Sequence, residues 1–376
     1  MSGGPVFLTS RFLFMNAFDK ITEAESDCLK SARRGMLVCI VAFVAAIVLL
    51  LATTIAKSET LPVQPPPLGV QPTAEEIELG RFMFFNKSLS TTGTHSCATC
   101  HDPRQGWTDG LPVAVGILNQ AGTRNTPTLV NVGYGNLMFW DGRTISTTAR
   151  ALLPISNPIE MGRQSEQQVV ARLNGDAEVV QRFARVYGID RQTGRAVTGI
   201  RLARSLAGFQ ASLTSANAPI DRFRDGDKNA LTADAQIGYS IFEKSGCMQC
   251  HPAPLYTTNG FANNGSEFAG KSRITDQGRF GVVSSGRGRE TVRAFKIPTL
   301  REIARTAPYM HAGQFDSIER VVAHYNAGGA NFRGQRDSFI DPRIKPLGLT
   351  ETQGQYLATF LKEAFAGAEY PMIEEP

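Results

Sequence analysis

Two short strings, Cys97–His101 and Cys247–His251, have the pattern Cys-x-x-Cys-His. Two cysteines at this spacing can form thioether bonds to a porphyrin, and the histidine then lies beside the porphyrin iron. A zinc site would need further cysteine or histidine ligands, and the chain beyond residue 60 has few. We therefore predict two covalent haem c groups. The expected attachment points and proximal ligands are Cys97, Cys100, His101, Cys247, Cys250 and His251.

The other histidines limit what can bind the two irons from the opposite side. After the predicted proximal ligands, only His95, His311 and His324 remain, and none lies between residues 101 and 251. His95 stands two residues before Cys97, where local packing or a hydrogen bond is the simpler explanation. The first haem is therefore predicted to lack a distal histidine, and an open iron can bind peroxide.

The sequence after each string repeats one pattern, which indicates an internal duplication. Pro127–Leu129 and Pro298–Leu300 both read Pro-Thr-Leu, and 27 residues after each proline stand Pro154 and Tyr325, respectively. Proline has no side-chain lone pair, so Pro154 would leave the first iron open. The alternative interpretation is that Pro154 is only a turn residue.

A helix predicted after residue 317 would place Tyr325 beside the second haem. Its apolar positions follow the i, i+3, i+4, i+7 spacing of one helix face. These positions are Ile318, Val321, Val322 and Tyr325. Tyr325 is therefore expected to face the interior, either as a core side chain or as an iron ligand. His324 lies about 100° around the helix and is expected to face outward or sideways.

Glu160 is the candidate acid–base group. It lies six residues after Pro154, within the string Asn157–Gly162. A carboxyl group near an open iron can move the proton that cleavage of a peroxide O–O bond requires. A glutamate after Asn-Pro is also typical of the first turn of a helix, and that alternative stays open.

Capping patterns predict the helices that position these residues. Thr73 begins a capping box and a helix that includes Phe84, and Thr232 opens a matching helix that includes Phe242. Thr350 begins a last helix with an apolar face. That face contains Leu357, Phe360, Leu361 and Phe365. Strand signals are few, so we predict an all-α protein.

Length and composition favour two folded domains. The chain has 376 residues, 42% hydrophobic and 19% charged, which is ordinary for a globular protein and excludes a disordered one. The duplication predicts two tandem cytochrome c-like domains at 73–225 and 226–376. The net charge of +5 gives no indication of nucleic-acid binding.

The N-terminal region contains an uncharged apolar run, Met36–Ala56, which is long enough to cross a membrane as one helix. More basic residues precede the run than follow it, which places residues 1–35 in the cytoplasm and the rest outside. Residues 57–72 are proline-rich and are predicted to be a stiff linker. A cleaved signal peptide is the alternative. Either way, the body is expected in the periplasm, anchored to the inner membrane or soluble there.

Taken together, several motifs resemble those of the bacterial dihaem cytochrome c peroxidase family, which includes the MauG proteins. The resemblance covers roughly residues 73–365 and is more specific than the Cys-x-x-Cys-His strings alone. The motifs are Leu79–Arg81, Ser96–His101, Arg124–Pro127, Phe139–Arg143, Glu160–Gly162 and Thr306–His311.

The resemblance implies a division of labour between the haems. The N-terminal haem would react with peroxide, and the C-terminal haem would deliver electrons. Glu160 would be the distal acid–base residue, and Trp140 would relay electrons between the haems. His311 would lie near the interhaem region, on a haem propionate. Asn125 and the backbone carbonyls of Thr306 and Pro308 resemble the family's calcium site, whose oxygen ligands suit a hard cation.

Three departures from the family pattern matter, and the first of them resembles the MauG-like branch. Tyr325 stands where typical peroxidases have a methionine ligand. The loop after the first string lacks the histidine that must leave the iron on reductive activation. Arg150 stands where family members often have a distal glutamine, which would alter how peroxide is held. The resemblance therefore implies an enzyme that is active in its diferric state.

Three functions remain open at this stage. The first is a peroxidase that reduces hydrogen peroxide with electrons from a small periplasmic cytochrome or cupredoxin, or from a membrane quinol. The second is a MauG-like oxidase that modifies residues of a partner protein. The third is a membrane-tethered electron carrier, which would require two fully ligated haems.

Overall fold

A computed structural model describes residues 71–375, apart from 146, 191–193, 269–275, 287, 330, 333 and 334. The predicted cytoplasmic tail, membrane-spanning helix and most of the linker lie outside the described residues. In the part that is described, no helix is long and apolar enough to span a membrane. The segment Ser58–Pro376 forms one compact unit.

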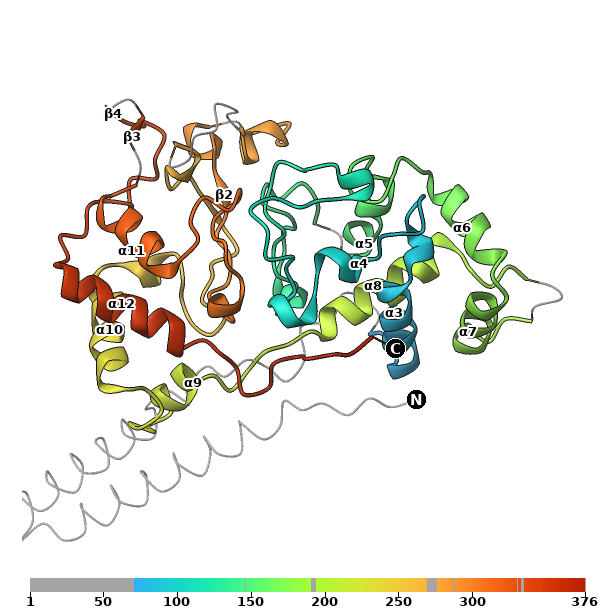
Figure 1. The fold of residues 1–376 in the computed structure, drawn as a ribbon, viewed down its shortest axis with the longest axis horizontal. Helices are drawn as coiled ribbons and strands as arrows, with labels where there is room; N and C mark the ends of the chain where they lie inside the picture. The colour runs from blue at the N-terminus through green and yellow to red at the C-terminus, as the bar shows by residue number, and fades with distance from the viewer. Residues whose placement is uncertain are drawn as a thin grey trace, which may run out of the picture. The chain divides into compact units, whose positions relative to one another are not determined.

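Ten α-helices account for most of the regular structure among the described residues (Figure 1). They are α3 (Ala74–Phe85), α4 (Cys97–Cys100), α5 (Thr147–Ser156), α6 (Glu166–Asn174), α7 (Ala177–Tyr187), α8 (Gly199–Ser212), α9 (Pro219–Arg224), α10 (Ala233–Lys244), α11 (Ile318–Asn326) and α12 (Glu351–Glu363). Short 3₁₀ turns occur between them, including η5 (Cys247–Gln249). The long connections between these helices carry most of the site residues.

The predicted capping patterns are confirmed. The Thr73 hydroxyl accepts a hydrogen bond from the Glu76 backbone N–H at 3.2 Å, and the Glu76 carboxylate accepts one from the Thr73 N–H at 2.9 Å. Thr350 forms the same box at the start of α12, and Thr232 caps α10. These caps satisfy N–H groups that the first turn of a helix leaves without a partner.

The duplication is visible in how the helices pack. A β-carbon added to Gly80 of α3 would lie 2.0 Å from the backbone oxygen of Ser205 in α8. One added to Gly238 of α10 would lie 2.1 Å from that of Tyr356 in α12. In each pair a glycine is required because the two backbones touch.

Each helix pair contributes to its own hydrophobic core. One core includes Phe84, Trp107 and Phe209, with the two phenylalanine rings 5.1 Å apart. The other includes Phe242 and Phe360, with rings 5.3 Å apart. Two such cores fit the predicted domain plan, although the boundary between residues 225 and 226 remains a prediction.

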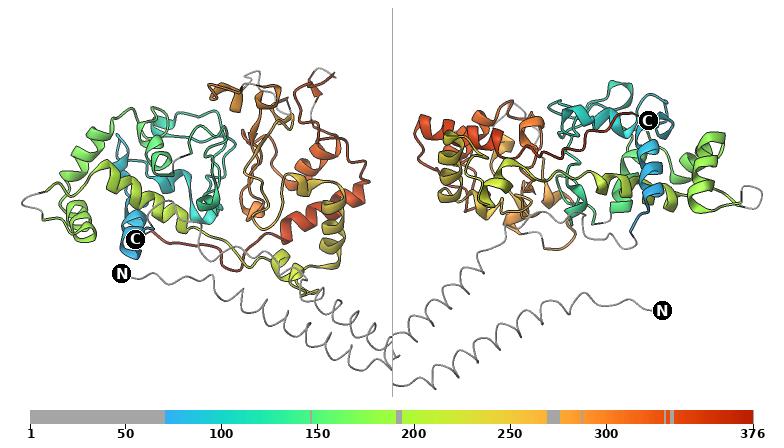
Figure 2. Two further views of the ribbon diagram at one scale, coloured as in Figure 1. Left: turned by 180° about the vertical axis from the view of Figure 1, so that it is seen from behind. Right: turned by 90° about the horizontal axis from the view of Figure 1, so that it is seen from below.

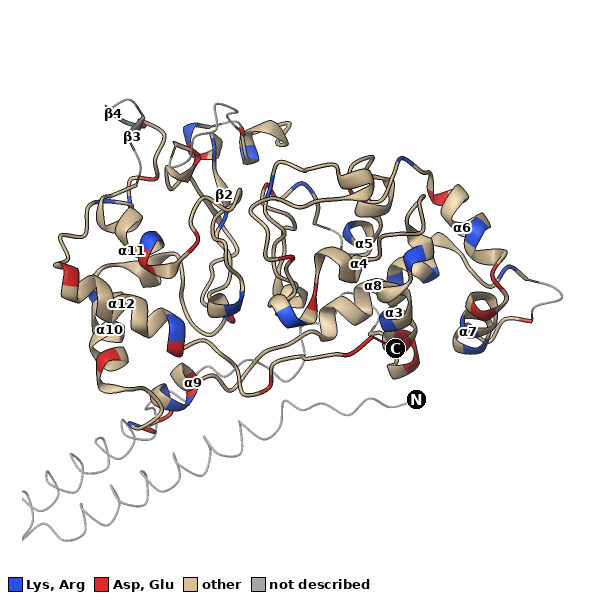
Figure 3. Ribbon diagram, in the orientation of Figure 1, with Lys and Arg blue, Asp and Glu red and all other residues tan. Residues whose placement is uncertain are grey.

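Strands are short and rare among the described residues. The antiparallel pairs are β1 (Phe261–Ala262) with β2 (Phe295–Lys296), and β3 (Asn331–Phe332) with β4 (Gln335–Arg336). The fold is therefore helix-rich, as the predicted all-α class required, with two small β-ribbons that the sequence did not reveal. Basic and acidic residues are interspersed over both halves of the body (Figure 3).

The C-terminal tail returns to the N-terminal half of the body. Figures 1 and 2 show the chain end beside α3. The Trp107 indole N–H donates to the Pro371 carbonyl at 3.1 Å, and the Tyr370 hydroxyl donates to the Pro103 carbonyl. Arg81 donates to the Glu374 carbonyl at 3.1 Å. The tail therefore joins the two halves.

Candidate haem-binding site

One cavity of about 950 Å³ lies along both halves and is lined by both Cys-x-x-Cys-His strings. Protein interiors normally contain few voids larger than a water molecule, so a cavity of this size indicates a large prosthetic group. The cysteines of the two strings are free thiols. A zinc site would need further ligands, and the described residues contain no group of three or more histidine, cysteine or acidic residues that could hold a metal ion. The residues therefore fit haem better than zinc.

The first proximal histidine is held by a backbone carbonyl. His101 Nδ1 donates to the Trp107 oxygen at 3.0 Å, which leaves Nε2 free for iron. Trp107 is fully buried and has a positive φ of 61°, which aims its carbonyl at the ring. Burial also lowers the pKa of His101, so the neutral form that binds metal is favoured.

The second proximal histidine is held in the same way. His251 Nδ1 donates to the Tyr256 oxygen at 2.9 Å, and Tyr256 is fully buried with a φ of 52°. Burial lowers the pKa of His251 too. Sequence reasoning missed both supporting carbonyls. The available signal was an aromatic residue five or six positions after each histidine.

Pro154 lines the cavity from the last turns of α5. The alternative that it is only a turn residue is wrong, since it lies inside the helix. Proline has no N–H to donate to the carbonyl four residues earlier, which belongs to Arg150. Arg150 lines the same cavity one turn earlier and is buried. Its Nη1 donates to the Met138 sulfur at 3.2 Å.

Glu160 also lines the cavity and is half-buried. It lies in a turn after α5, so the alternative of a helix N-terminal position is wrong. Burial raises its carboxyl pKa, and Arg143 and the hydrogen bond from Asn157 partly oppose that shift. The Asn157 amide donates to Oε1 at 2.7 Å. A carboxyl group held in this way, with a raised pKa, suits general acid–base chemistry.

Tyr325 lines the cavity from α11, on the predicted interior face. Its hydroxyl oxygen accepts a hydrogen bond from the Asn264 amide at 3.0 Å. Burial raises the Tyr325 pKa to about 12, while the Asn264 bond acts in the opposite direction. A donor on the phenol oxygen favours the phenolate that iron would bind.

His324 corrects one prediction. It is only 8% exposed, and its Nε2 donates to the Asn264 carbonyl at 2.9 Å. The ring of Phe315 covers it at 5.0 Å. A helix-face argument placed it outward or sideways because it ignored the loops that cover this side of α11.

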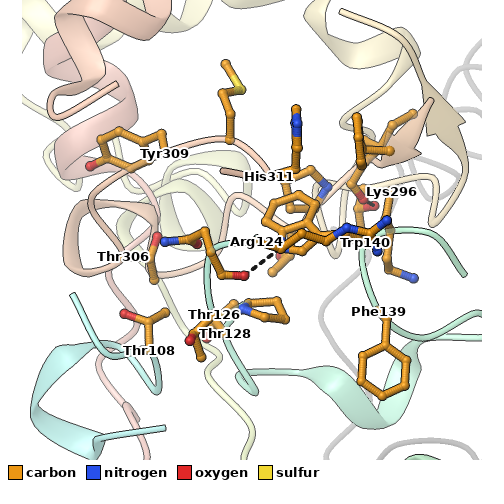
Figure 4. A pocket seen from close by; sticks show the side chains of 18 of the residues that line it. Thr108, Arg124, Thr126, Thr128, Phe139, Trp140, Lys296, Thr306, Tyr309 and His311 are labelled. Atoms are coloured by element: carbon orange, nitrogen blue, oxygen red, sulfur yellow. Dashed lines mark hydrogen bonds between the residues drawn. The ribbon is translucent and has the colours of Figure 1, made fainter. Parts of the chain in front are cut away.

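Trp140 is fixed at both its indole and its backbone. The indole N–H donates to the Asn125 carbonyl at 2.8 Å, and the Trp140 carbonyl accepts from the Lys296 N–H at 2.7 Å. The first contact lies in the N-terminal half and the second reaches the C-terminal half. Figure 4 shows Trp140 beside Lys296 and His311 in the cavity wall.

His311 is buried in a polar cluster of the C-terminal half. Its ring stacks on Phe295 with centroids 3.5 Å apart, and its Nε2 lies 2.7 Å from the Glu267 carboxylate. Its backbone carbonyl accepts from the Asn125 N–H at 2.8 Å. His311 is therefore linked through Asn125 to Trp140.

The three predicted calcium-site residues, Asn125, Thr306 and Pro308, all line the cavity. The Asn125 amide nitrogen donates to the Leu111 carbonyl at 2.8 Å. The described residues hold no cluster of three or more histidine, cysteine or acidic residues suited to a metal. A calcium ion here would therefore depend on amide and carbonyl oxygens.

Comparisons with known proteins agree with this geometry. The family model for di-haem cytochrome c peroxidase matches residues 74–229. The methylamine utilization protein MauG of Methylorubrum extorquens is 37% identical over 292 residues, covering 77% of this chain and 78% of the relative. The cytochrome c551 peroxidase of Nitrosomonas europaea is 34% identical over 263 residues, covering 69% and 75%.

A solved structure has a similar fold. It is described as a MauG-like protein associated with microbial copper homeostasis, with a TM-score of 0.72 and 25% identity. The match covers 86% of this chain and 98% of the solved chain. It therefore includes both halves of the described body.

Proposed function

This chain belongs to the family of di-haem cytochrome c peroxidases that includes MauG, and on that premise we propose a peroxidase function. It is a haem-dependent oxidoreductase. We propose that hydrogen peroxide reacts at the first haem, and that the second haem relays electrons to it. The observation that supports this best is the difference between two equivalent helices, which present Pro154 and Tyr325 to the cavity.

The haem groups, when bound, supply the iron that takes up peroxide and exchanges electrons. The protein supplies the remaining parts. His101 and His251, oriented by backbone carbonyls, would bind the irons. Pro154 lines the cavity without a side-chain lone pair and would leave room there for peroxide. The four cysteine thiols would attach the haems covalently.

Glu160 moves the proton. Reduction of hydrogen peroxide consumes two electrons and two protons and gives two waters. The Glu160 carboxylate would take a proton from one oxygen of the peroxide and return it to the other, so that the leaving oxygen departs as water. Asn157 holds the carboxylate in place through the 2.7 Å hydrogen bond.

Trp140 carries electrons between the two sites. Its two hydrogen bonds hold the indole within the cavity wall. The electrons come from a small periplasmic cytochrome or cupredoxin, or from a membrane quinol. We also propose a calcium ion at Asn125, Thr306 and Pro308. The N-terminal apolar run holds the body at the periplasmic face of the inner membrane, or is removed there as a signal peptide.

A second candidate function is favoured by Tyr325. In the MauG-like branch, oxidising equivalents from peroxide modify residues of a partner protein. An anionic oxygen ligand at the second haem would stabilise its oxidised state, and Asn264 donates to that oxygen at 3.0 Å. Such a haem could share the oxidising equivalents instead of only delivering electrons.

The first experiment adds stoichiometric hydrogen peroxide to the as-isolated diferric protein, followed by optical and EPR spectroscopy. Rapid loss of a high-spin ferric signal is expected, because the first iron is open. A long-lived oxidised state would favour the protein-modifying oxidase, and rapid return on addition of a reduced cytochrome would favour the peroxidase. No reaction in either the diferric or the half-reduced protein would contradict both and leave the electron carrier.

A further inference from the structure

Arg150 is a buried cation without an ionic partner among the described residues. Its exposed fraction is 6%, and its Nε and Nη2 have no hydrogen-bond partner there. Its Nη1 donates to the Met138 sulfur at 3.2 Å, and a thioether is a weak acceptor. Leaving a guanidinium in this state is costly, so Arg150 requires an anion.

The contrast with a second arginine in the same cavity makes this requirement specific. Arg124 binds two carboxylates, those of Asp141 and Asp276, at 2.6 Å each. Burial lowers the pKa of Arg150 to about 10, so it remains a cation at neutral pH. Arg150 is the basic residue of α5, a helix without an acidic residue.

Lys296 brings a second cation to the same place. Its Nζ donates to the Leu137 carbonyl at 2.5 Å, and Arg150 contacts the next residue, Met138. Both cations line the cavity, and no ion pair of either one occurs in the described part of the chain. Burial, with the Arg150 charge adding to it, lowers the pKa of Lys296 to about 8.

We propose that Arg150 and Lys296 form an anion-binding site beside the first haem that accepts a carboxylate or a small carboxylate-like anion. Two oxygens are enough to satisfy the free edge of the guanidinium, and the lysine supplies a second contact. The carboxylate comes either from a propionate of the first haem or from a free anion in the open pocket. The proposal rests on haem binding at the first site and does not require peroxide turnover.

The test uses the diferric holoprotein and the variants Arg150→Gln, Lys296→Gln and Arg150→Lys. Arg163→Gln is the control, because Arg163 is exposed and lies outside the cavity. Two quantities are measured: the reduction potential of the first haem, and the affinity for sodium formate from the optical spectrum of the high-spin iron. Haem content and circular dichroism show whether each variant folds.

A propionate ligand predicts a more negative reduction potential in both glutamine variants, because a cation near a propionate favours the reduced haem. A free-anion site instead predicts a loss of formate affinity of roughly tenfold or more, the scale of one charge-assisted contact. Arg150→Lys keeps the positive charge, so it should change the reduction potential or the formate affinity less than Arg150→Gln does. The proposal is overturned if both quantities match those of Arg163→Gln. If Arg150→Gln does not fold, the half-buried Lys296→Gln decides alone.

Because both readouts need only bound haem, they separate this proposal from the peroxidase function. If the parent protein is inert to peroxide but the glutamine variants change the reduction potential or the formate affinity, the proposed function is contradicted and the anion site is supported. If the parent protein consumes peroxide but the variants change neither quantity, the proposed function is supported and the anion site is contradicted.

Discussion

The two Cys-x-x-Cys-His sites agree on the proximal side and differ on the distal side. Each proximal histidine donates to the carbonyl of a fully buried aromatic residue with positive φ, at 3.0 Å for His101 and 2.9 Å for His251. On the distal side one helix presents Pro154 and the other presents Tyr325. The two sites therefore share one proximal arrangement, and we propose that single residues on the other side determine what each haem does.

The distal surroundings differ as much as the two residues themselves. Beside Pro154 lie Arg150, without a counter-ion among the described residues, and Glu160, whose pKa burial raises. Beside Tyr325 lies Asn264, which donates to the phenol oxygen. We therefore propose that the first site transfers protons and admits a ligand, and that the second site holds the Tyr325 oxygen on iron.

The largest expected effect comes from removing the proton-transfer group of the first site. Glu160→Gln should lower kcat/KM for peroxide by about 10²–10⁴-fold, the range typical of a lost general acid–base group. In the parent protein the rate should fall as pH decreases through the raised pKa of Glu160, because the carboxylate must accept a proton. This acidic limb should be absent from the variant. Stopped-flow rates against pH measure both effects.

The matched control for this comparison is Glu178→Gln, on the exposed surface of α7, where only an ion pair with Arg182 is lost. It should leave the rate and the pH profile unchanged. Retention of the acidic limb in Glu160→Gln would show that another group moves the proton.

Tyr325→Phe should make the second site resemble the first. Loss of the oxygen ligand should remove the low-spin signal of the second haem and produce a second high-spin signal in the EPR spectrum. Any long-lived oxidised state should decay faster in the variant. The expected increase in its decay rate is about 10–100-fold or more, the effect typical of losing a residue that supports a metal ligand. A low-spin spectrum that survives unchanged would show that Tyr325 does not bind iron.

Asn264→Ala tests the same site more gently, because it removes only the donor to the Tyr325 oxygen. It should keep the low-spin signal and shift the reduction potential of the second haem downward, because a phenolate oxygen without its hydrogen-bond donor gives more electron density to ferric iron. Spectroelectrochemistry measures this shift. An unchanged potential would mean that the hydrogen bond to the phenol does not persist when haem is bound.

The smallest expected effects concern the frame that the two sites share. Gly80→Ala and Gly238→Ala should each lower the free energy of unfolding by about 1–3 kcal/mol, because the new methyl group meets a backbone oxygen. Gly354→Ala, in α12, is the control. Its nearest neighbour would be 3.8 Å away, so it should be neutral or stabilising by about 1 kcal/mol.

Calorimetry of these variants also tests the predicted boundary at residues 225 and 226. If the halves are separate folding units, each alanine should shift one transition and leave the other in place. A single transition that shifts equally in both variants would show that the body unfolds as one unit.

The sequence alone was sufficient where local patterns decide structure. The caps at Thr73 and Thr350 depend on spacing along one element, and they were correctly predicted. Spacing also predicted the α11 residues that line the cavity, Val321, Val322 and Tyr325, but not the burial of His324. The duplication predicted equivalent positions for Pro154 and Tyr325, and both residues line the cavity from a helix.

Prediction failed where distant segments decide the environment. His324 is buried because Phe315 and the carbonyl of Asn264 cover its side of α11, and helical periodicity does not report on such loops. The pairing of Lys296 with Arg150 is set by contacts to Leu137 and Met138, more than 150 residues before Lys296. No short-range pattern carries that information.

The C-terminal tail has a consequence for how the protein is made. Pro371 accepts the hydrogen bond of Trp107, the residue whose carbonyl orients His101. A segment more than 260 residues further along the chain therefore completes the surroundings of the first histidine string, and it is synthesised long after that string. A purification tag or truncation at the C-terminus should thus impair maturation of the first haem site more than that of the second.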